Sequence, residues 1–437
     1  MSAIAQYLKG TGVDVAGSDR LFAPGTEQLI KQQFESQGIL CFNQDGSGLT
    51  RDVSVVVIST AIEDSNSELV KAREMGIPVM KRSELLAAIS SGKKTIAVGG
   101  TSGKSTTTAM IFHILEQTGH QPSLMTGAGL SSLQRRGLPG NAWVGNGEWL
   151  VIESDESDGS IVNYVPEVSV VLNIDRDHKE LDELVQLFTT FKNNTRKNFI
   201  VNNDFEITRS LGQNSDFDFG VNTKSPVQGS NYTQEGFNIS FNINNIPFSI
   251  PVPGRHNMEN AMAASAVALS IGISLDKSAM ALTTYEGIYR RSQLVGKQRG
   301  VYVVDDFAHN PAEVSAAIKS CQNISNRVIA WFQPHGFGPL KFMYNELVHE
   351  VCETLRSTDL FYITDVYYAG GTVNKEITSD MVINEMKHRC SNVNYMAHRD
   401  ELLPLWKLEA KDGDIILLMG ARDTTMSDFA LKVLENL

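Results

Sequence analysis

The chain has 437 residues, which is too many for one ordinary domain and enough for two or three. Hydrophobic residues make up 42% and charged residues 20%, as in a typical globular protein, and the net charge of −12 argues against a nucleic-acid-binding protein, which needs a basic face. No apolar run reaches the roughly 18 residues of a membrane span, and no basic segment followed by an apolar one opens the chain, so we expect a cytoplasmic protein.

Residues 1–90 alternate short apolar stretches with helical ones, after an opening helix expected at Met1–Leu8. The expected strands and helices are Val13–Ala16, Val53–Ser59, Glu68–Met75, Ile77–Met80 and Ser83–Ile89. This alternation favours a parallel sheet with crossover helices. Because the polar stretch Ser90–Lys94 marks a joint, we predict an N-terminal domain of residues 1–93.

A second α/β unit follows, predicted to span residues 94–288. Its expected strands are Thr95–Val98, Trp149–Ile152, Val168–Asn173 and Phe199–Asn202. Residues 213–250 alternate with period two, which is typical of antiparallel strands. Helices are expected at Ser105–Gln117 and, after the break at Pro253-Gly254, at Ala261–Ile271.

Composition changes again around Gly287–Gly296, and a third α/β unit is predicted over residues 289–437. Its expected strands are Val301–Val304, Val328–Phe332, Phe361–Thr364 and Ile415–Met419. The whole chain is therefore predicted to be an α/β protein of three domains.

A glycine-rich turn lies between the strand and the helix that open the central domain, and it reads Gly99-Gly100-Thr101-Ser102-Gly103-Lys104-Ser105-Thr106. Glycines let consecutive N–H groups face a phosphate, and the following helix presents its positive pole to the anion. Lys104, expected to face solvent in the absence of a phosphate, can reach the β- and γ-phosphates, and the Ser105 hydroxyl can bind Mg²⁺. The full G-x-x-x-x-G-K-[ST] pattern is not met, because Val98 stands where its first glycine would be.

Several further motifs occur along the chain in the same order as in the Mur ligase family. Together with the short G-T-x-G-K-[ST]-T form of the loop, they resemble the motifs of that family. They are Met1–Ala5, Ala16–Asp19, Glu153–Asp158, Asn173–His178, Pro253–Asn257 with Asn260, Arg290-Arg291, Asp305–Pro311 and Phe332–His335. The order of the motifs, rather than any one of them, carries the resemblance. It implies a truncated Rossmann-like N-terminal domain for a UDP-sugar-type substrate, a central P-loop ATPase domain and a C-terminal Rossmann-like α/β domain.

The resemblance also implies an activity. Such enzymes use ATP and Mg²⁺ to convert a carboxylate into an acyl-phosphate, which an amino acid or a short peptide then attacks. The nearest branch of the family acts on UDP-N-acetylmuramate in peptidoglycan synthesis or recycling, so the expected partners are small molecules. Two alternatives stay open, namely a ligase for a non-UDP acid, as in folylpolyglutamate synthetases, and a non-catalytic ATP-binding relative.

Family precedent assigns Glu153 and His178 to metal, together with Ser105. Both follow predicted strands, and the carboxyl ends of parallel strands are where open α/β sheets bind ligands. Asp155, Glu156 and Asp158 are acidic neighbours that could belong to the site or to a solvated turn.

The resemblance implies nucleotide contacts on two further segments. His256, Asn257 and Asn260 are expected near the adenine, although all three could instead cap or pack the alanine-rich helix. Arg291 is expected to contact the γ-phosphate, and Asp306 and His309 to reach ATP on domain closure. The resemblance thus gives Lys104, Glu153, His178 and Arg291 as catalytic residues, and as cofactor-binding residues Gly100, Thr101, Ser102, Gly103, Lys104, Ser105, Thr106, His256, Asn257, Asn260, Arg291, Asp306 and His309.

The chain departs from the family pattern in three places. The glycine-rich turn that holds the UDP diphosphate lies just before the segment matched by Met1–Ala5, so we expect this 437-residue form to bind the UDP sugar weakly. Pro334–Leu340 lacks both arginines of the family's P-H-R-Y-T-R-T. The position of a carbamylated lysine falls near Thr189 rather than at Lys192, so no carbamate is assigned.

The four cysteines are widely spaced and include no CxxC pair. We expect them to be free thiols in a reducing compartment, at positions Cys41, Cys321, Cys352 and Cys390.

Overall fold

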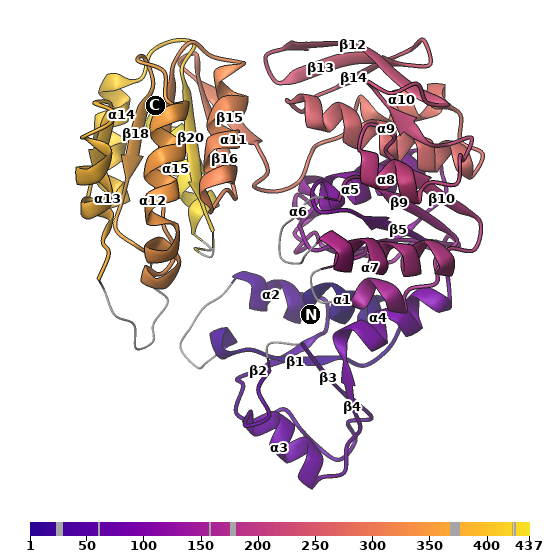
Figure 1. The fold of residues 1–437 in the computed structure, drawn as a ribbon. Coiled ribbons are helices and arrows are strands. Elements are labelled where there is room, and N and C mark those ends of the chain that lie inside the picture. The colour runs from indigo at the N-terminus through magenta and orange to yellow at the C-terminus, as the bar shows by residue number, and fades with distance from the viewer. Residues whose placement is uncertain are drawn as a thin grey trace. The chain divides into compact units, whose positions relative to one another are not determined.

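The structure, a computed structural model, describes residues 1–437 except 23–28, 60–61, 157–158, 175–180, 368–375, 422 and 424. The chain divides into two compact units (Figure 1). The first comprises Met1–Thr233, Ile239–Pro251 and Arg255–Tyr289, and the second comprises Gln234–Asn238, Val252–Gly254 and Arg290–Leu437. The predicted N-terminal and central parts both lie in the first unit. In the part of the chain that is described, no helix has the length and apolarity of a membrane span.

The N-terminal part contains two small parallel sheets, each of two strands, β1 with β2 and β3 with β4. Three of its strands lie within a few residues of the predicted positions. The elements are α1 (Ser2–Gly10), β1 (Ala16–Ser18), α2 (Leu29–Ser36), β2 (Leu40–Phe42), β3 (Val56–Ile58), α3 (Ser67–Glu74), β4 (Val79–Lys81) and α4 (Arg82–Ser91).

Helix α1 is anchored to the central part, and its Ala5 also packs against the small N-terminal core of Phe22, Phe34 and Ile39. Its Ile4 and Tyr7 are buried in the same hydrophobic core as Ile152 of the central sheet. The Gln6 amide donates to Asn141 Oδ1 at 2.7 Å, and the Asn141 amide donates back to the Ser2 hydroxyl at 2.7 Å. Apolar burial and a closed pair of hydrogen bonds therefore join the first helix to the central sheet.

The central sheet has the order β10-β9-β5-β8-β6-β7, and all pairs are parallel except β6 with β7. Strand β5 is buried from its second residue on, as expected for a parallel strand covered on both faces. Helix α7 covers one face through Phe188 and Phe191, while α5 and α9 pack together against the strands. The elements are β5 (Lys94–Gly99), α5 (Lys104–Gln117), β6 (Ser123–Met125), α6 (Ser131–Gln134), β7 (Ala142–Trp143), β8 (Trp149–Glu153), β9 (Val168–Val171), α7 (Leu181–Asn194), β10 (Asn198–Val201), α8 (Glu206–Leu211), α9 (Arg255–Ser270) and α10 (Leu275–Leu282).

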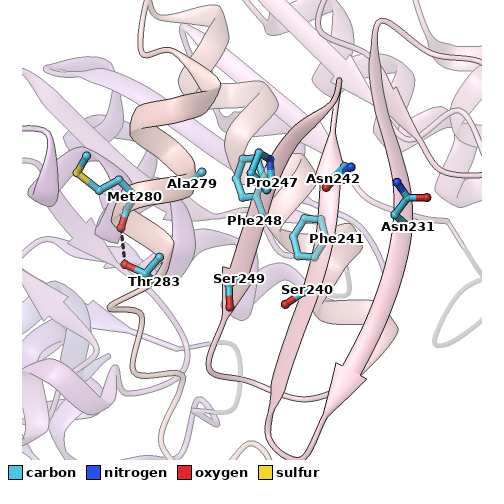
Figure 2. A pocket seen from close by; sticks show the side chains of 10 residues that line it. All are labelled: Asn231, Ser240, Phe241, Asn242, Pro247, Phe248, Ser249, Ala279, Met280 and Thr283. Carbon is cyan, nitrogen blue, oxygen red and sulfur yellow. Dashed lines mark hydrogen bonds between the residues drawn. The ribbon is translucent and has the colours of Figure 1, made fainter.

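The segment predicted to be antiparallel forms a second sheet, of order β11-β12-β13-β14. Strands β13 and β14 are an antiparallel hairpin, closed by Asn244 and Asn245, both at positive φ, as a tight two-residue turn requires. The prediction is wrong for β11, which pairs parallel with β12. A groove of about 460 Å³ lies between this sheet and α10, beside the stacked rings of Phe241 and Phe248 (Figure 2). The strands are β11 (Phe219–Gly220), β12 (Val227–Glu235), β13 (Asn238–Ile243) and β14 (Ile246–Ile250).

The second unit is built around a six-stranded sheet of order β15-β16-β20-β17-β18-β19, parallel except for the edge strand β15. Alternate strand residues enter two separate cores, one under α11, α12 and α13 and the other under α14 and α15, so the sheet is covered on both faces. The elements are β15 (Gln293–Gln298), β16 (Val301–Asp306), α11 (Pro311–Gln322), β17 (Val328–Gln333), α12 (Phe337–Thr354), β18 (Leu360–Ile363), α13 (Ser379–Met386), β19 (Val393–Tyr395), α14 (Leu402–Glu409), β20 (Ile415–Gly420) and α15 (Met426–Asn436).

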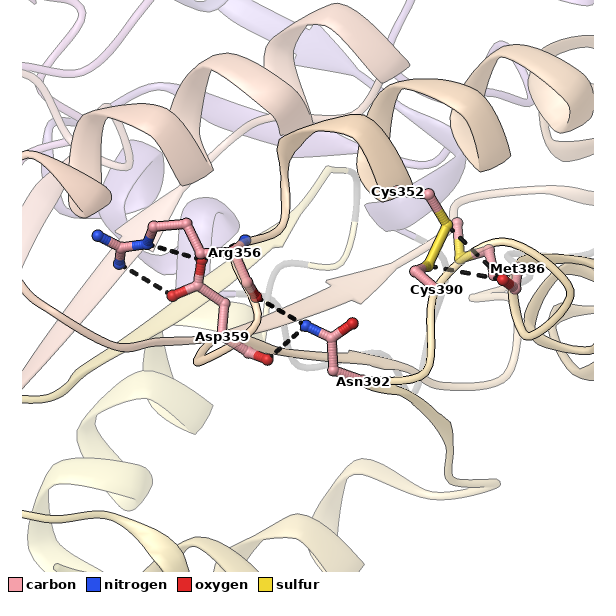
Figure 3. Close-up of a disulfide and its surroundings, with 6 residues drawn as sticks. All are labelled: Cys352, Arg356, Asp359, Met386, Cys390 and Asn392. Atoms are coloured by element: carbon pink, nitrogen blue, oxygen red, sulfur yellow. Dashed lines mark hydrogen bonds and ion pairs between the residues drawn. A yellow bond between two sulfur atoms is a disulfide. The ribbon is translucent and has the colours of Figure 1, made fainter.

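Two of the four cysteines are joined in a disulfide, so the prediction of free thiols is wrong for them. Cys352 in the last turn of α12 is bonded to Cys390, which follows α13, with 5.6 Å between their Cα atoms (Figure 3). Cys41 and Cys321 are free. The spacing of 38 residues gave no sign of the pair because tertiary folding, rather than a local motif, brings α12 and α13 together.

Breaking this disulfide is expected to destabilise the second unit. A crosslink across 38 residues restricts the unfolded chain and contributes about 2–4 kcal/mol in the chain-entropy picture. We expect Cys352→Ser to lower the melting temperature by several degrees, while Cys41→Ser, at a half-buried free thiol, changes it little. Thermal unfolding with and without a reductant measures the effect. A wild-type melting temperature that does not respond to reductant contradicts the expectation.

Candidate active site

The glycine-rich turn connects β5 to α5, in the strand–loop–helix arrangement that the sequence predicts. Gly100 and Gly103 have φ angles of 134° and 85°, which only glycine adopts without strain. A Cβ atom on Gly103 would lie 2.5 Å from Asn260 Oδ1, and one on Gly100 would lie 3.1 Å from the Asn173 carbonyl oxygen. The positive φ angles and these close contacts therefore favour glycine at both positions. The first turn of α5, with Lys104, Ser105 and Thr106, presents backbone N–H groups at a helix N-terminus, which favours an anion.

Asn173, just beyond the end of β9, holds the loop in shape. Its carbonyl oxygen accepts from Thr101 N at 3.1 Å. Its side chain accepts from Ser102 N at 2.8 Å and donates to the Ser102 carbonyl at 3.2 Å. Asn173 opens one of the motifs in the sequence but was assigned no role there. The sequence signal that could have indicated this role is an asparagine just after β9, the strand that pairs with β5.

Lys104 is not solvent-facing, so that expectation is wrong. Its ammonium donates to the Gly100 carbonyl at 2.6 Å and to both oxygens of Glu156 at 3.0 and 3.1 Å. The Lys104 side chain is 17% exposed and that of Glu156 is 8% exposed. Burial raises the pKa of Glu156, and the positive charge of Lys104 opposes that rise. Glu156, one of the acids whose role the sequence left open, therefore lies at the phosphate loop rather than in a solvated turn.

Glu153 is the last residue of β8, and Val98 of β5 stands directly beside it in the parallel register. Its carboxylate accepts from Gly127 N at 3.0 Å and from the Thr126 hydroxyl. The carboxylate thus lies at the carboxyl ends of the parallel strands, where β5 leads into the phosphate loop. The Ser105 hydroxyl and the Glu153 carboxylate are hard oxygen donors of the kind that Mg²⁺ prefers, so these two residues fit the metal. His178 and Asp158 lie outside the described residues.

Helix α9 begins at Arg255, before the predicted start of the alanine-rich helix, and contains His256, Asn257 and Asn260. His256 is exposed, whereas both asparagines are buried. Asn260 Oδ1 accepts from the Thr107 hydroxyl of α5 at 3.2 Å, and the Asn260 amide donates to Asn257 Oδ1 at 3.2 Å. Asn260 therefore contacts both the first turns of α5, through Thr107, and the backbone at Gly103.

In the second unit, the two neighbouring arginines differ. Arg290 is buried and donates to Asp305 at 3.0 Å and to the Gly420 carbonyl at 2.7 Å, so it has a structural role. Arg291 is exposed, as the expected phosphate contact requires. Asp306, at the end of β16, accepts from Ser292 N at 2.6 Å, and burial raises its pKa.

His309 follows β16 in the same unit. Its Nδ1 lies 2.9 Å from Glu313 Oε2, and the hydrogen bond to Glu313 raises the pKa of His309. Its ring lies 5.4 Å, centroid to centroid, from that of His335. Asp306, His309 and His335 are thus gathered at the carboxyl ends of β16 and β17, the edge where parallel sheets bind ligands.

The positions of the two absent arginines are Gly336 and Pro339, at the start of α12. Gly336 precedes this helix with a φ of 83°, and Pro339 lies in its first turn, where proline is tolerated. The first turn of α12 thus presents no cationic side chain at these two places, next to His335.

Three family models match the chain in succession. They describe the catalytic domain of the Mur ligase family over residues 1–94, the Mur ligase middle domain over residues 98–268, and the glutamate ligase domain of Mur ligases over residues 290–422.

Curated relatives match over nearly the whole chain. The UDP-N-acetylmuramate–L-alanine ligase of Carboxydothermus hydrogenoformans is 34% identical over 99% of this chain and 93% of its own length. The enzyme of the same name from Streptomyces coelicolor is 34% identical over 100% of this chain and 95% of its own length.

Solved structures show the same architecture. The UDP-N-acetylmuramate–alanine ligase of Thermotoga maritima has a TM-score of 0.82 at 25% identity, covering 99% of this chain and 96% of that one. A murein peptide ligase from Psychrobacter arcticus shares the fold, with a TM-score of 0.66 at 20% identity over 100% of this chain and 97% of its own.

Proposed function

This chain belongs to the Mur ligase family, and on that premise we propose that it is an ATP-dependent ligase joining L-alanine to UDP-N-acetylmuramate. Full-length relatives at 34% identity carry the name of that activity. The observation that carries the proposal is the phosphate loop with Lys104 and Glu153 at one edge of the central sheet. A non-catalytic relative would not need to keep both side chains at this edge.

The residues of the central sheet have distinct proposed roles. The backbone N–H groups at the α5 N-terminus hold the ATP phosphates. Lys104 draws charge from the γ-phosphate while an oxygen of the substrate carboxylate attacks the γ-phosphorus and ADP leaves. The amino group of the acceptor then attacks the carbonyl carbon of the acyl-phosphate, loses a proton, and inorganic phosphate leaves as the amide bond forms. Ser105, Glu153 and His178 would hold Mg²⁺, which supplies positive charge to the phosphate oxygens. Arg291, Asp306, His309, His256, Asn257 and Asn260 stay predicted nucleotide contacts.

The proposed acceptor is L-alanine rather than a short peptide. Full-length relatives at 34% identity are named for L-alanine, and this supports the choice. Gly336 and Pro339 stand where the family motif has two arginines, so these two positions do not distinguish the two acceptors.

We also propose that the reaction takes place in the cytoplasm, where ATP is available, and that the partners are small molecules. The net charge of −12 supports a protein that does not bind nucleic acid.

The substrate assignment is tested by measuring phosphate release with each component omitted in turn. We expect release to require ATP, UDP-N-acetylmuramate and L-alanine together, with a product heavier than the UDP sugar by one alanine residue. A parallel reaction with a pteroate-type acid and L-glutamate tests the non-UDP alternative. Turnover with that pair, and none with the muramyl pair, would overturn the substrate assignment.

A further inference from the structure

The ammonium of Lys104 in the phosphate loop has a buried acidic partner, Glu156. An ammonium group has three N–H donors. In this loop its acceptors are the Gly100 carbonyl at 2.6 Å, the two Glu156 oxygens at 3.0 and 3.1 Å and, at 3.4 Å, the Thr101 carbonyl. The donors that a nucleotide phosphate needs are thus directed at Glu156.

A second lysine–glutamate pair lies at the opposite ends of β5 and β8, the strands that precede Lys104 and Glu156. Lys94 starts β5, Glu148 precedes β8, and their side chains meet at 2.6 Å. Their side chains are 45% and 58% exposed, so water screens this pair, whereas Glu156 is 8% exposed. The pair at the loop therefore exerts a much stronger local field than its counterpart.

We propose that Glu156 is a positioning residue that holds Lys104 in the phosphate loop and opposes the entry of a polyphosphate until the Lys104 ammonium moves from Glu156 to the phosphate. The inference rests on the proposed function, since it assumes that the loop binds ATP. Glu156 fixes the long lysine side chain before the nucleotide arrives, which reduces the conformational entropy lost on binding. Its negative charge also repels the phosphates and weakens the ground-state complex.

These two effects act in opposite directions in one variant. Glu156→Gln removes the repelling charge, so a polyphosphate should bind more tightly. The same change loosens Lys104, so turnover should fall. A purely structural role for Glu156 predicts instead that affinity and turnover decline together.

The test is calorimetric titration of the full chain with ADP in the presence of EDTA, together with steady-state turnover. Glu156→Gln should bind metal-free ADP at least about fivefold more tightly than wild type, because one nearby charge is removed. Its turnover should fall at least about fivefold. Glu148→Gln makes the same charge change at the exposed pair and should match wild type in both measurements.

Glu156→Asp separates charge from reach and serves where the glutamine variant fails to fold. It should keep wild-type ADP affinity, because the charge remains, and still lose at least about fivefold in turnover, because the shorter side chain holds Lys104 less firmly. Wild-type or weaker ADP affinity in Glu156→Gln, or full turnover in Glu156→Asp, overturns the inference and leaves the proposed function intact. A wild-type protein that binds no ADP either in EDTA or with Mg²⁺ overturns both.

Discussion

Replacing Lys104 by alanine is expected to reduce ATP-dependent phosphate release by at least about 100-fold, because one preorganised cation at the developing charge is removed. The loose transition state of phosphoryl transfer depends on positioning and charge rather than on covalent help. Nucleotide affinity should change less than turnover, since the loop N–H groups remain.

Glu156, the buried partner of Lys104, determines whether the Lys104→Ala variant remains folded and can be compared with wild type. Removing the lysine leaves the Glu156 carboxylate without its counter-ion, and an unpaired buried charge is destabilising. Glu156 can take up a proton, since burial already raises its pKa, so the fold should persist with a lower melting temperature. Lys94→Ala removes the lysine of the exposed pair and is the matched control. Near-wild-type phosphate release by folded Lys104→Ala at saturating substrates would show that the loop has another role.

The second large effect is expected at the proposed metal ligands. Glu153→Gln and His178→Ala should each abolish acyl-phosphate formation at low Mg²⁺ or raise the Mg²⁺ concentration required for it. Glu153 lies at the edge of the sheet beside the phosphate loop, and an amide replaces a charged ligand by a neutral one.

Acyl-phosphate is measured by trapping it with hydroxylamine across a Mg²⁺ titration. Glu167→Gln is a suitable control, because Glu167 lies before β9, at the other end of the sheet, and pairs with Lys197. Normal trapping by either ligand variant at low Mg²⁺ would rule out a metal-binding role for that residue.

The central and C-terminal sheets were predictable because their strands are buried on both faces and read as continuous apolar runs. β5, β8, β17 and β20 lie within one residue of their predicted bounds. The strand β1 was placed earlier than it occurs, because a half-exposed strand of three residues has a weak pattern. The strands β2, β6, β7 and β19, of two or three residues each, were missed because so short a run has no readable period, and the largely polar edge strand β15 was missed as well.

The site was predictable where one local motif determines it and not where folding brings distant residues together. The loop glycines and the start of α5 follow from a continuous stretch of sequence. The contact of Lys104 with Glu156 joins residues 52 positions apart, and that of Thr107 with Asn260 joins residues 153 apart. Neither separation leaves a pattern in the sequence. The exposure of Lys104 was therefore misjudged, and the role of Glu156 became visible only in the structure.

The central claim is that a carboxylate oxygen of the substrate attacks the γ-phosphate of ATP before the amide bond forms. Labelling both carboxylate oxygens of UDP-N-acetylmuramate with ¹⁸O and analysing the released phosphate by mass spectrometry tests this directly. An acyl-phosphate transfers one carboxylate oxygen to phosphorus, so we expect one ¹⁸O atom in each inorganic phosphate released with the amide product. Phosphate without ¹⁸O, formed while the amide product accumulates, would contradict the account.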